Sequence, residues 1–268
     1  GDLVLLNATS TSDMTWDSAA PGVVGAWRQE SGYTGTVSFE TEYDSMASMV
    51  LLTIASDCII SNGTWTHGDN NTAEEYRLNV SVGGDFTLYS GAGINVQGKG
   101  YEYQQGPGQP VSASYSGGSH GGIGGYVYNY PGEMGPAYGS YMMPTNLGSG
   151  GRSDSSAEGG GAVRLNVDGL CTIDGTIDAD GQNGASYAGG AGGSVYITAA
   201  TFGGSGTISA DGASASSTYG AGAGGRVSVV LSSGTSFGSV TMTAYPATLG
   251  GNGQKPSAGT VYTKTESQ

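Results

Sequence analysis

Three aspartates in the segment DGTIDADGQNG are spaced like oxygen ligands for a hard cation. Asp174, Asp178 and Asp180 lie beside glycines, and carboxylate oxygens at alternating positions are ligands that calcium prefers. Two features oppose a calcium site. Strand alternation would put all three carboxylates on an outer face, and the next copy of the segment keeps only Asp211. We expect solvated carboxylates and no cofactor, with calcium as the alternative.

The cations Lys99, Arg164 and Arg226 are the side chains that could neutralise an acidic sugar in a polysaccharide lyase. Such an enzyme needs a base and a charge-neutralising group over the same sugar. The repeat described below aligns Arg226 with Ser194 and not with Arg164, so the cations do not gather on one strand face. The sequence therefore predicts no catalytic residue, and a lyase is the least favoured of three functions.

Tyrosines are concentrated in one glycine-rich segment, residues 99–158. They are Tyr101, Tyr103, Tyr115, Tyr126, Tyr128, Tyr130, Tyr138 and Tyr141. A tyrosine ring offers an apolar face and a polar tip, which suit sugars and protein interfaces. Three interpretations stay open: the rings pack this segment onto the rest of the chain, contact a protein partner, or bind a glycan.

The two cysteines, Cys58 and Cys171, each lie in an apolar alternation. Free cysteine behaves as a small buried hydrophobe, so we expect two buried, unpaired thiols. The cysteines and the two histidines, His67 and His120, have no zinc-ligand spacing. The sequence therefore predicts no metal site beyond the weak calcium candidate.

Composition points to an extracellular setting. Glycine supplies 52 of 268 residues, and charged residues make up 11% against roughly 25% in ordinary globular chains. The net charge of −14 opposes binding to nucleic acid or to an anionic membrane, and no run of 18 apolar residues predicts a membrane span. The first residues, Gly1-Asp-Leu-Val-Leu-Leu, are those of a processed mature chain or of a trimmed one. We therefore expect a secreted or cell-surface protein from the composition alone. Four sequons make candidate glycosylation sites of Asn7, Asn62, Asn70 and Asn79.

An internal repeat is the strongest pattern in the chain. GGAVRLNV begins at Gly160, GGSVYITA at Gly192 and GGRVSVVL at Gly224, which is a spacing of 32 residues. GTIDADG and GTISADG repeat beside it, 31 residues apart, from Gly175 and Gly206. Such periods are typical of solenoids, and copies that run in one direction must pair in parallel. The repeat predicts an all-β, right-handed parallel β-helix with about 31–32 residues per coil.

Alternation within the repeat assigns faces. Val163, Val195 and Val227 should form one buried ladder, and Ile177 should stack on Ile208. Cys171 should stack on Phe202. The residues of opposite parity, which should point outward, are Arg164, Tyr196 and Ser228.

Two regions depart from the repeat. Residues 1–75 contain strand-like runs that are not separated by glycine clusters. They predict an N-terminal β segment, which either begins the β-helix or forms a small sheet. Residues 76–268 predict the β-helix, and residues 99–158 predict a long insertion in it. Long insertions on regular solenoids are commonly functional or contact a partner.

The order of several motifs resembles a known module. Trp65-Thr-His, YRLNVSVGGD, GKGY, GGIGG, LGSGG, GGAVRL, GTIDADG and GGSVYIT occur in sequence between Trp65 and Tyr262. They resemble a glycine-rich parallel β-helix module of large secreted or surface proteins of environmental bacteria. The resemblance implies an architecture and an extracellular setting, and it implies no activity.

The ends of a solenoid expose strand edges that can pair with another chain. The first segment, residues 2–9, is apolar and β-prone, and we expect it either to cap its own solenoid or to add a strand to a neighbouring copy. The assembly residues predicted on this basis are Leu3, Val4, Leu5, Leu6, Val261 and Tyr262. The sequence thus favours an extracellular structural protein that forms head-to-tail homopolymers. The alternative is an adhesin that binds polysaccharide.

Overall fold

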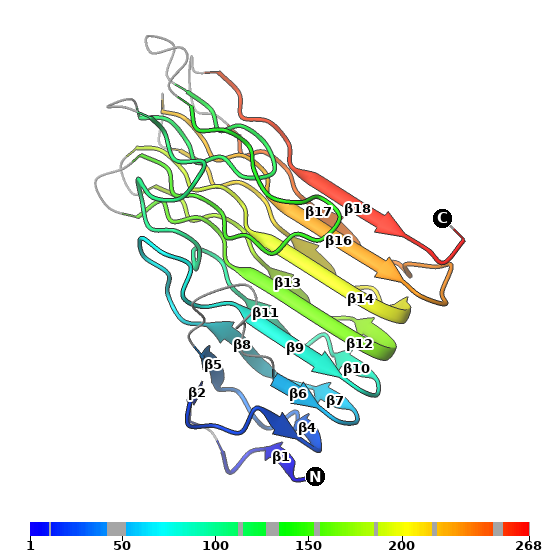
Figure 1. The fold of residues 1–268 in the computed structure, drawn as a ribbon. Helices are drawn as coiled ribbons and strands as arrows, with labels where there is room; N and C mark the ends of the chain where they lie inside the picture. The colour runs from blue at the N-terminus through cyan, green and yellow to red at the C-terminus, as the bar shows by residue number, and fades with distance from the viewer. Residues whose placement is uncertain are drawn as a thin grey trace.

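A computed structural model of the chain describes residues 1–10, 12–41, 52–111, 115–126, 134–152, 156–184, 187–215, 219–248 and 254–267. Within these ranges the chain is all-β and contains no helix, and hence no helix that could cross a membrane. Its strands form two sheets, in which every pairing between strands is parallel. The arrows of Figure 1 gather on one side of the molecule, and segments without arrows fill the other side.

The larger sheet has eleven strands. They are β1 (Leu3–Leu6), β3 (Val23–Val24), β4 (Ala26–Gln29), β6 (Leu52–Ile54), β7 (Cys58–Ile60), β9 (Leu78–Val82), β10 (Phe86–Leu88), β12 (Ala162–Ile173), β14 (Ser194–Gly203), β16 (Arg226–Leu231) and β18 (Thr260–Lys264). The smaller sheet has seven: β2 (Met14–Asp17), β5 (Thr36–Glu40), β8 (Gly63–His67), β11 (Ala92–Asn95), β13 (Thr176–Asp178), β15 (Thr207–Ser209) and β17 (Thr241–Thr243). Strands β1 to β8 belong to the same two sheets as the later strands, so the N-terminal region forms no separate sheet.

The larger sheet consists of two columns of strands side by side. The first column runs β3, β6, β9, β12, β14, β16, β18, and the second runs β1, β4, β7, β10, β12, β14. The long strands β12 and β14 belong to both columns, and an irregularity between Val167 and Leu170 separates the two halves of β12. The chain therefore makes repeated circuits: first column, second column, smaller sheet, then back through a glycine-rich segment.

Inward residues of successive circuits stack in the predicted register. Val163 pairs with Val195, and Val195 with Val227, and all three are buried. The predicted pairs Ile177–Ile208 and Cys171–Phe202 are also present. These side chains belong to one continuous core that runs from Leu6 to Leu231. The ladder predicted from the repeat is thus confirmed.

Both thiols are buried and unpaired, as expected. Phe86 explains why they do not bridge, because it pairs with Cys58 on one side and with Cys171 on the other. The cysteines therefore lie two strand spacings apart, about 9.6 Å, which is beyond the reach of a disulfide. Burial raises the pKa of both thiols, which keeps them protonated.

The glycine-rich segments form a second packed layer rather than simple turns. Their backbones bond to one another directly: Gly118 N–H donates to Gly189 O at 3.0 Å, and Gly189 N–H donates to Gly220 O at 3.1 Å. The segment predicted as an insertion is part of this layer, because Gly160 N–H donates to Ala191 O and Ala223 N–H donates to Gly118 O. Residues 99–158 are thus built into the body of the molecule where they are described.

Glycine is required in this layer mainly by close packing. A Cβ atom at Gly193 would lie 1.9 Å from Gly161 O, and one at Gly222 would lie 1.8 Å from Gly190 O. Neither glycine has a positive φ, so neighbouring backbone and not backbone conformation excludes a side chain. The layer takes the place of a side-chain core on this side of the molecule.

Residues 134–147 cross the outer surface of the first column as a strap. Arg226 donates two hydrogen bonds to Tyr138 O at 3.0 and 2.8 Å, and Ser228 Oγ donates to Met142 O at 2.8 Å. Ser194 Oγ donates to Asn146 O at 2.6 Å. Ser228 points outward, as its parity in the repeat predicts. Its side chain does point away from the core, but the strap covers it.

Candidate functional site

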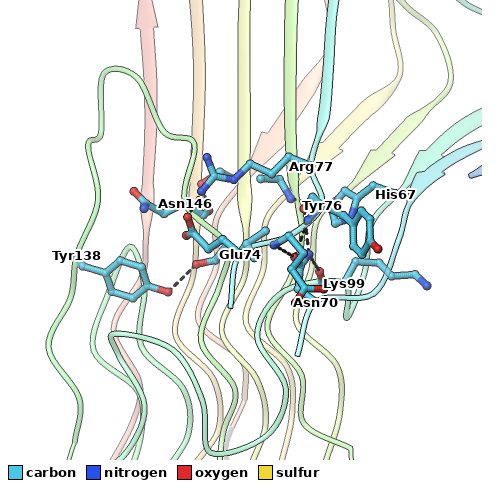
Figure 2. A network of polar contacts seen from close by, with 12 residues as sticks. His67, Asn70, Glu74, Tyr76, Arg77, Lys99, Tyr138 and Asn146 are labelled. Carbon is cyan, nitrogen blue, oxygen red and sulfur yellow. Dashed lines mark hydrogen bonds and ion pairs between the residues drawn. The ribbon is translucent and has the colours of Figure 1, made fainter. Parts of the chain in front are cut away.

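The densest polar network lies where the smaller sheet passes into the glycine layer. Figure 2 shows His67, Asn70, Glu74, Arg77 and Lys99 gathered there. His67 is the last residue of β8, and Arg77 directly precedes β9, so the segment between the two strands carries most of the network. The network was not predicted, because its residues share no repeat or motif spacing.

His67 is fully buried and fixed by backbone groups on both ring nitrogens. Its Nδ1 lies 2.8 Å from Gly68 O, and its Nε2 accepts the Ala162 N–H at 3.1 Å. This pattern requires the neutral tautomer with the proton on Nδ1. Burial lowers the pKa of His67 to about 4, and the charges of Lys99 and Arg77 act in the same direction.

Asn70 ties together three parts of the chain. Its Nδ2 donates to Tyr76 O at 3.0 Å and to Lys99 O at 2.7 Å, while Oδ1 accepts the N–H groups of Glu75 and Tyr76. The amide is buried and all its polar atoms are engaged, so it has no room for a glycan. The candidate glycosylation at Asn70 is incompatible with this fold.

Glu74 joins a buried arginine to a tyrosine. Arg77 pairs with Glu74, and the arginine side chain is only 2% exposed. Glu74 also accepts a hydrogen bond from Tyr101, whose pKa is raised chiefly by burial and further by the Glu74 charge. Lys99 pairs with Asp69 at 2.6 Å on the surface nearby. The charged groups thus compensate each other within the protein.

Tyr138 anchors the strap from the opposite side of Figure 2. Its hydroxyl donates to Leu147 O at 2.6 Å and lies 2.8 Å from Ser149 Oγ. Ser149 Oγ in turn accepts the Gly108 N–H at 2.9 Å. Burial raises the pKa of Tyr138, so the hydroxyl is a hydrogen-bond donor and not an acid.

These polar groups hold parts of the chain together and do not form a catalytic arrangement. A general base must reach a substrate proton, but His67 and His120 are both buried. His120 Nδ1 lies 2.8 Å from Gly192 O, and burial lowers the pKa of His120 to about 4. Among the described residues, neither histidine can offer a nitrogen to solvent.

The predicted cations are separated. Lys99 pairs with Asp69, and Arg226 holds the strap. Arg164 lies exposed on β12, 5.9 Å above the ring of Tyr196. Arg226 pairs with Ser194 as the repeat predicted, and the three cations do not converge on one surface.

The calcium candidates bind backbone N–H groups, Asp174 and Asp180 those of the next circuit and Asp178 one of its own segment. Asp174 accepts the Ser205 N–H at 3.0 Å, Asp178 accepts the Asp180 N–H at 2.9 Å, and Asp180 accepts the Asp211 N–H at 2.6 Å. Burial raises the pKa of Asp180 to about 6, with a further contribution from the charge of Asp178. In the described part of the chain, no group of three or more His, Cys, Asp or Glu side chains could hold a metal ion.

The predicted tyrosines do not share one surface. Tyr101 is buried, Tyr103 and Tyr126 are half-buried, and Tyr141 is exposed on the strap beside Tyr262, with ring centroids 5.6 Å apart. Tyr128 and Tyr130 lie outside the described residues.

Tyr115 belongs to an aromatic cluster that sequence reasoning missed. Its ring stacks on Tyr187 at 4.4 Å and meets Tyr219 at 5.0 Å. Tyr187 and Tyr219 are 32 residues apart, so the repeat spacing itself could have identified this pair. The three half-buried rings come from three circuits of the glycine layer.

The remaining sequons differ in accessibility. Asn79 is buried on β9, whereas Asn7 and Asn62 are half-buried. Asn7 Oδ1 accepts only local hydrogen bonds from Thr9, in an exposed turn. Asn62 Nδ2 donates to Ser31 O at 2.9 Å. Asn7 is therefore the sequon whose side chain is tied least firmly to the fold.

The predicted assembly residues lie at opposite ends of the molecule, β1 at one end and β18 at the other (Figure 1). β1 pairs with β4 of its own chain, with Leu3 beside Ala26 and Leu6 beside Gln29. Val261 faces inward in register with Val227 and yet is 43% exposed. β1 belongs to the second column and β18 to the first, so the two strands do not extend the same column.

A pocket of about 210 Å³ opens between the two sheets near Arg77. Trp16, Phe39 and Asn79 line it, and Asp17 lies on its wall together with Arg77.

Comparison with known proteins adds no relative from which an activity could be carried over: no family model, curated protein or solved structure matches this chain.

Proposed function

We propose that this chain is a structural module of an extracellular or cell-surface protein, built as a right-handed parallel β-helix that stacks end to end. One observation supports the proposal: one register continues through the successive strands of the first column and of the smaller sheet. The inward column continues from Val163 through Val195 and Val227 to Val261 in four consecutive strands. A body built by adding one circuit at a time is a rod, and its stability depends on neighbour contacts.

The polar groups support a structural role. His67, His120 and Asn70 are buried, and each binds a backbone group far along the chain. The carboxylates of Asp174 and Asp180 likewise bind the backbone of the following circuit. The extracellular setting rests on composition, chiefly the few charged residues and the net charge of −14.

Electron microscopy and sedimentation of the purified chain test the stacking. We expect rods of constant width whose mean length increases with protein concentration. A chain that stays monomeric by light scattering at high concentration, with no rods in negative stain, would overturn the stacking.

An adhesin is the second candidate, and the cluster of Tyr115, Tyr187 and Tyr219 favours it. Stacked aromatic faces are suited to sugar rings. A glycan array tests this candidate, with Tyr219→Ala as the matched variant. Specific binding that is lost in Tyr219→Ala would favour the adhesin over the scaffold. A uronic-acid absorbance assay tests the lyase alternative directly.

A further inference from the structure

We infer that the outer face of the smaller sheet binds ice, through a row of threonines that repeats at the spacing of water molecules in the ice lattice. The inference goes beyond the proposed scaffold and does not depend on stacking. The ligand is a lattice of ordered water.

Equivalent outward positions carry threonine in five of the six consecutive strands β5, β8, β11, β13, β15 and β17. We call this set the threonine row, and its members are Thr36, Thr64, Gly93, Thr176, Thr207 and Thr241. Each member directly precedes the inward residue of its strand, as Thr176 precedes the buried Ile177, so the row faces away from the core.

A second polar row lies two residues farther along the strands. Its members are Thr15, Ser38, Thr66, Asn95, Asp178, Ser209 and Thr243, of which only Asp178 is charged. Hydroxyls of this row are engaged within the protein. Ser38 Oγ donates to Glu40 at 3.0 Å, and Thr243 Oγ1 donates to Asp211 at 3.1 Å.

The hydroxyls of the threonine row are available to a ligand. Thr176, Thr207 and Thr241 are exposed, and Thr36 and Thr64 are half-buried. No side-chain hydrogen bond joins any of these five hydroxyls to another described residue. Within the six strands the threonine row also carries no charge, although the chain has a net charge of −14. An uncharged row suits an uncharged lattice.

The spacing of the threonine row suits ice. Neighbouring strands of a sheet lie about 4.8 Å apart, and water oxygens repeat at nearly this distance along rows in hexagonal ice. A hydroxyl can donate one hydrogen bond and accept others, so it can take the place of a water molecule at the edge of the lattice. In the described strands of the smaller sheet no register shift interrupts the row.

Threonine also keeps such a row in a fixed arrangement. Its branched side chain is restricted at χ1, so the methyl and hydroxyl groups hold their positions better than a serine hydroxyl would. The buried residues behind the row, such as Trp65 and Ile208, fix the strands that carry it. A surface already ordered before binding loses little entropy when it meets a rigid lattice.

Gly93 is the gap in the threonine row, and it has room for a side chain. A Cβ atom there would have only Thr176 O within 4 Å, at 3.6 Å, which is an ordinary contact. Gly93→Thr therefore completes the row without strain.

Thermal hysteresis, the separation of the freezing point from the melting point, tests the inference. Dilute protein is used, so that the result is independent of stacking. The wild type should show hysteresis, and Gly93→Thr should show more. Gly203→Thr is the matched control, because it adds the same side chain at an open position of the larger sheet. It should behave like the wild type.

Thr207→Tyr tests the loss of binding. The large ring would hold the lattice away from Thr176 and Thr241, so hysteresis should be lost. Thr201→Tyr is the control, at an exposed position of the larger sheet, and should keep it. Both substitutions are at exposed positions, so the circular dichroism spectrum should stay unchanged.

Two results would overturn the inference without affecting the proposed scaffold. The first is a wild type without hysteresis, or hysteresis that neither Thr207→Tyr nor Gly93→Thr changes. The second is binding to crystalline cellulose that Thr207→Tyr abolishes, in a chain without hysteresis. That result would assign the face to a polysaccharide lattice instead.

Discussion

At Gly193 a single missing methyl group decides how closely two segments approach. A Cβ atom there would meet Gly161 O at 1.9 Å, far inside van der Waals contact, and the obstacle is backbone that cannot rotate away. Gly203, at the end of β14, has no atom within 4 Å of its Cβ position. The two glycines lie in one circuit and differ in their surroundings.

Gly193→Ala should therefore be costly and Gly203→Ala should not. We expect a loss of roughly 3 kcal/mol in the free energy of unfolding for Gly193→Ala, the upper range for overpacking. Gly203→Ala should stay within about 0.5 kcal/mol of the wild type. Urea unfolding followed by circular dichroism measures both. Equal stabilities of the two variants would contradict the idea of a layer packed by backbone.

The two buried histidines connect stability to pH. Their pKa values are lowered to about 4 in the folded chain, against about 6.5 when unfolded. Between these values the unfolded chain binds more protons, so stability falls as pH decreases from 6.5 towards 4. Asp180 acts in the opposite direction, because its raised pKa of about 6 makes the folded chain bind more protons below that pH.

His67→Gln should flatten this pH dependence. Each histidine lowers the free energy of unfolding by up to about 3 kcal/mol between pH 7 and pH 4. The variant should lack the contribution of one histidine. Asp180→Asn should steepen the loss, because it removes the opposing effect. Urea unfolding at pH 7, 5.5 and 4 distinguishes the three chains. A His67→Gln slope equal to that of the wild type would mean that this histidine is not held neutral.

Among the elements, the strap adds a second connection between β14 and β16, which already pair directly. It lies across β14 and β16, and its carbonyl groups accept hydrogen bonds from Ser194, Arg226 and Ser228. These donors occupy outward positions of the repeat, which would face solvent in a bare sheet. The strap therefore converts an exposed row into a buried interface.

Removing one of these donors should loosen the strap without unfolding the sheets. Ser228→Ala deletes the hydrogen bond to Met142 O, which contributes about 1 kcal/mol. Chymotrypsin should then cleave after the exposed Tyr141 about fivefold faster, if cleavage requires local opening of the strap. Ser233→Ala, at an exposed position just beyond β16, is the control and should leave the rate unchanged. Global stability should change little in either variant.

At the scale of the whole molecule, net charge opposes the association that the strand edges favour. Each copy carries a net charge of −14, and the proposed stacking would bring these charges together. The screening length falls from about 30 Å at 0.01 M salt to about 8 Å at 0.15 M salt. Repulsion between copies should therefore weaken sharply over this range.

Raising the salt concentration from 0.01 M to 0.15 M should strengthen end-to-end association by about tenfold or more, through screening of repulsion. Sedimentation velocity at fixed protein concentration measures the change. Association that weakens with added salt would indicate attraction between opposite charges at the contact instead.

The repeat in the sequence determined the register of the sheets. Val163, Val195 and Val227 recur at one spacing, and copies that run in one direction can stack only on equivalent residues. Alternation with period two then assigns each side chain to the core or to the outside, which correctly placed Cys171 and Ile177 in the core. These conclusions needed only local periodicity, so the sequence was sufficient.

Only the tertiary structure decided where the non-periodic segments lie. The strap buries Ser228, the turn before β9 buries Asn70, and Tyr115 joins Tyr187 and Tyr219 across three circuits. Each of these contacts joins residues far apart in a chain of glycine, serine and tyrosine that has no regular alternation. The backbone hydrogen bonds between glycine segments do not involve side chains. The pattern of side chains in the sequence therefore cannot predict which glycine segments bond to each other. The physical reason is that these contacts depend on which distant segments the fold brings side by side, and no local sequence pattern specifies that.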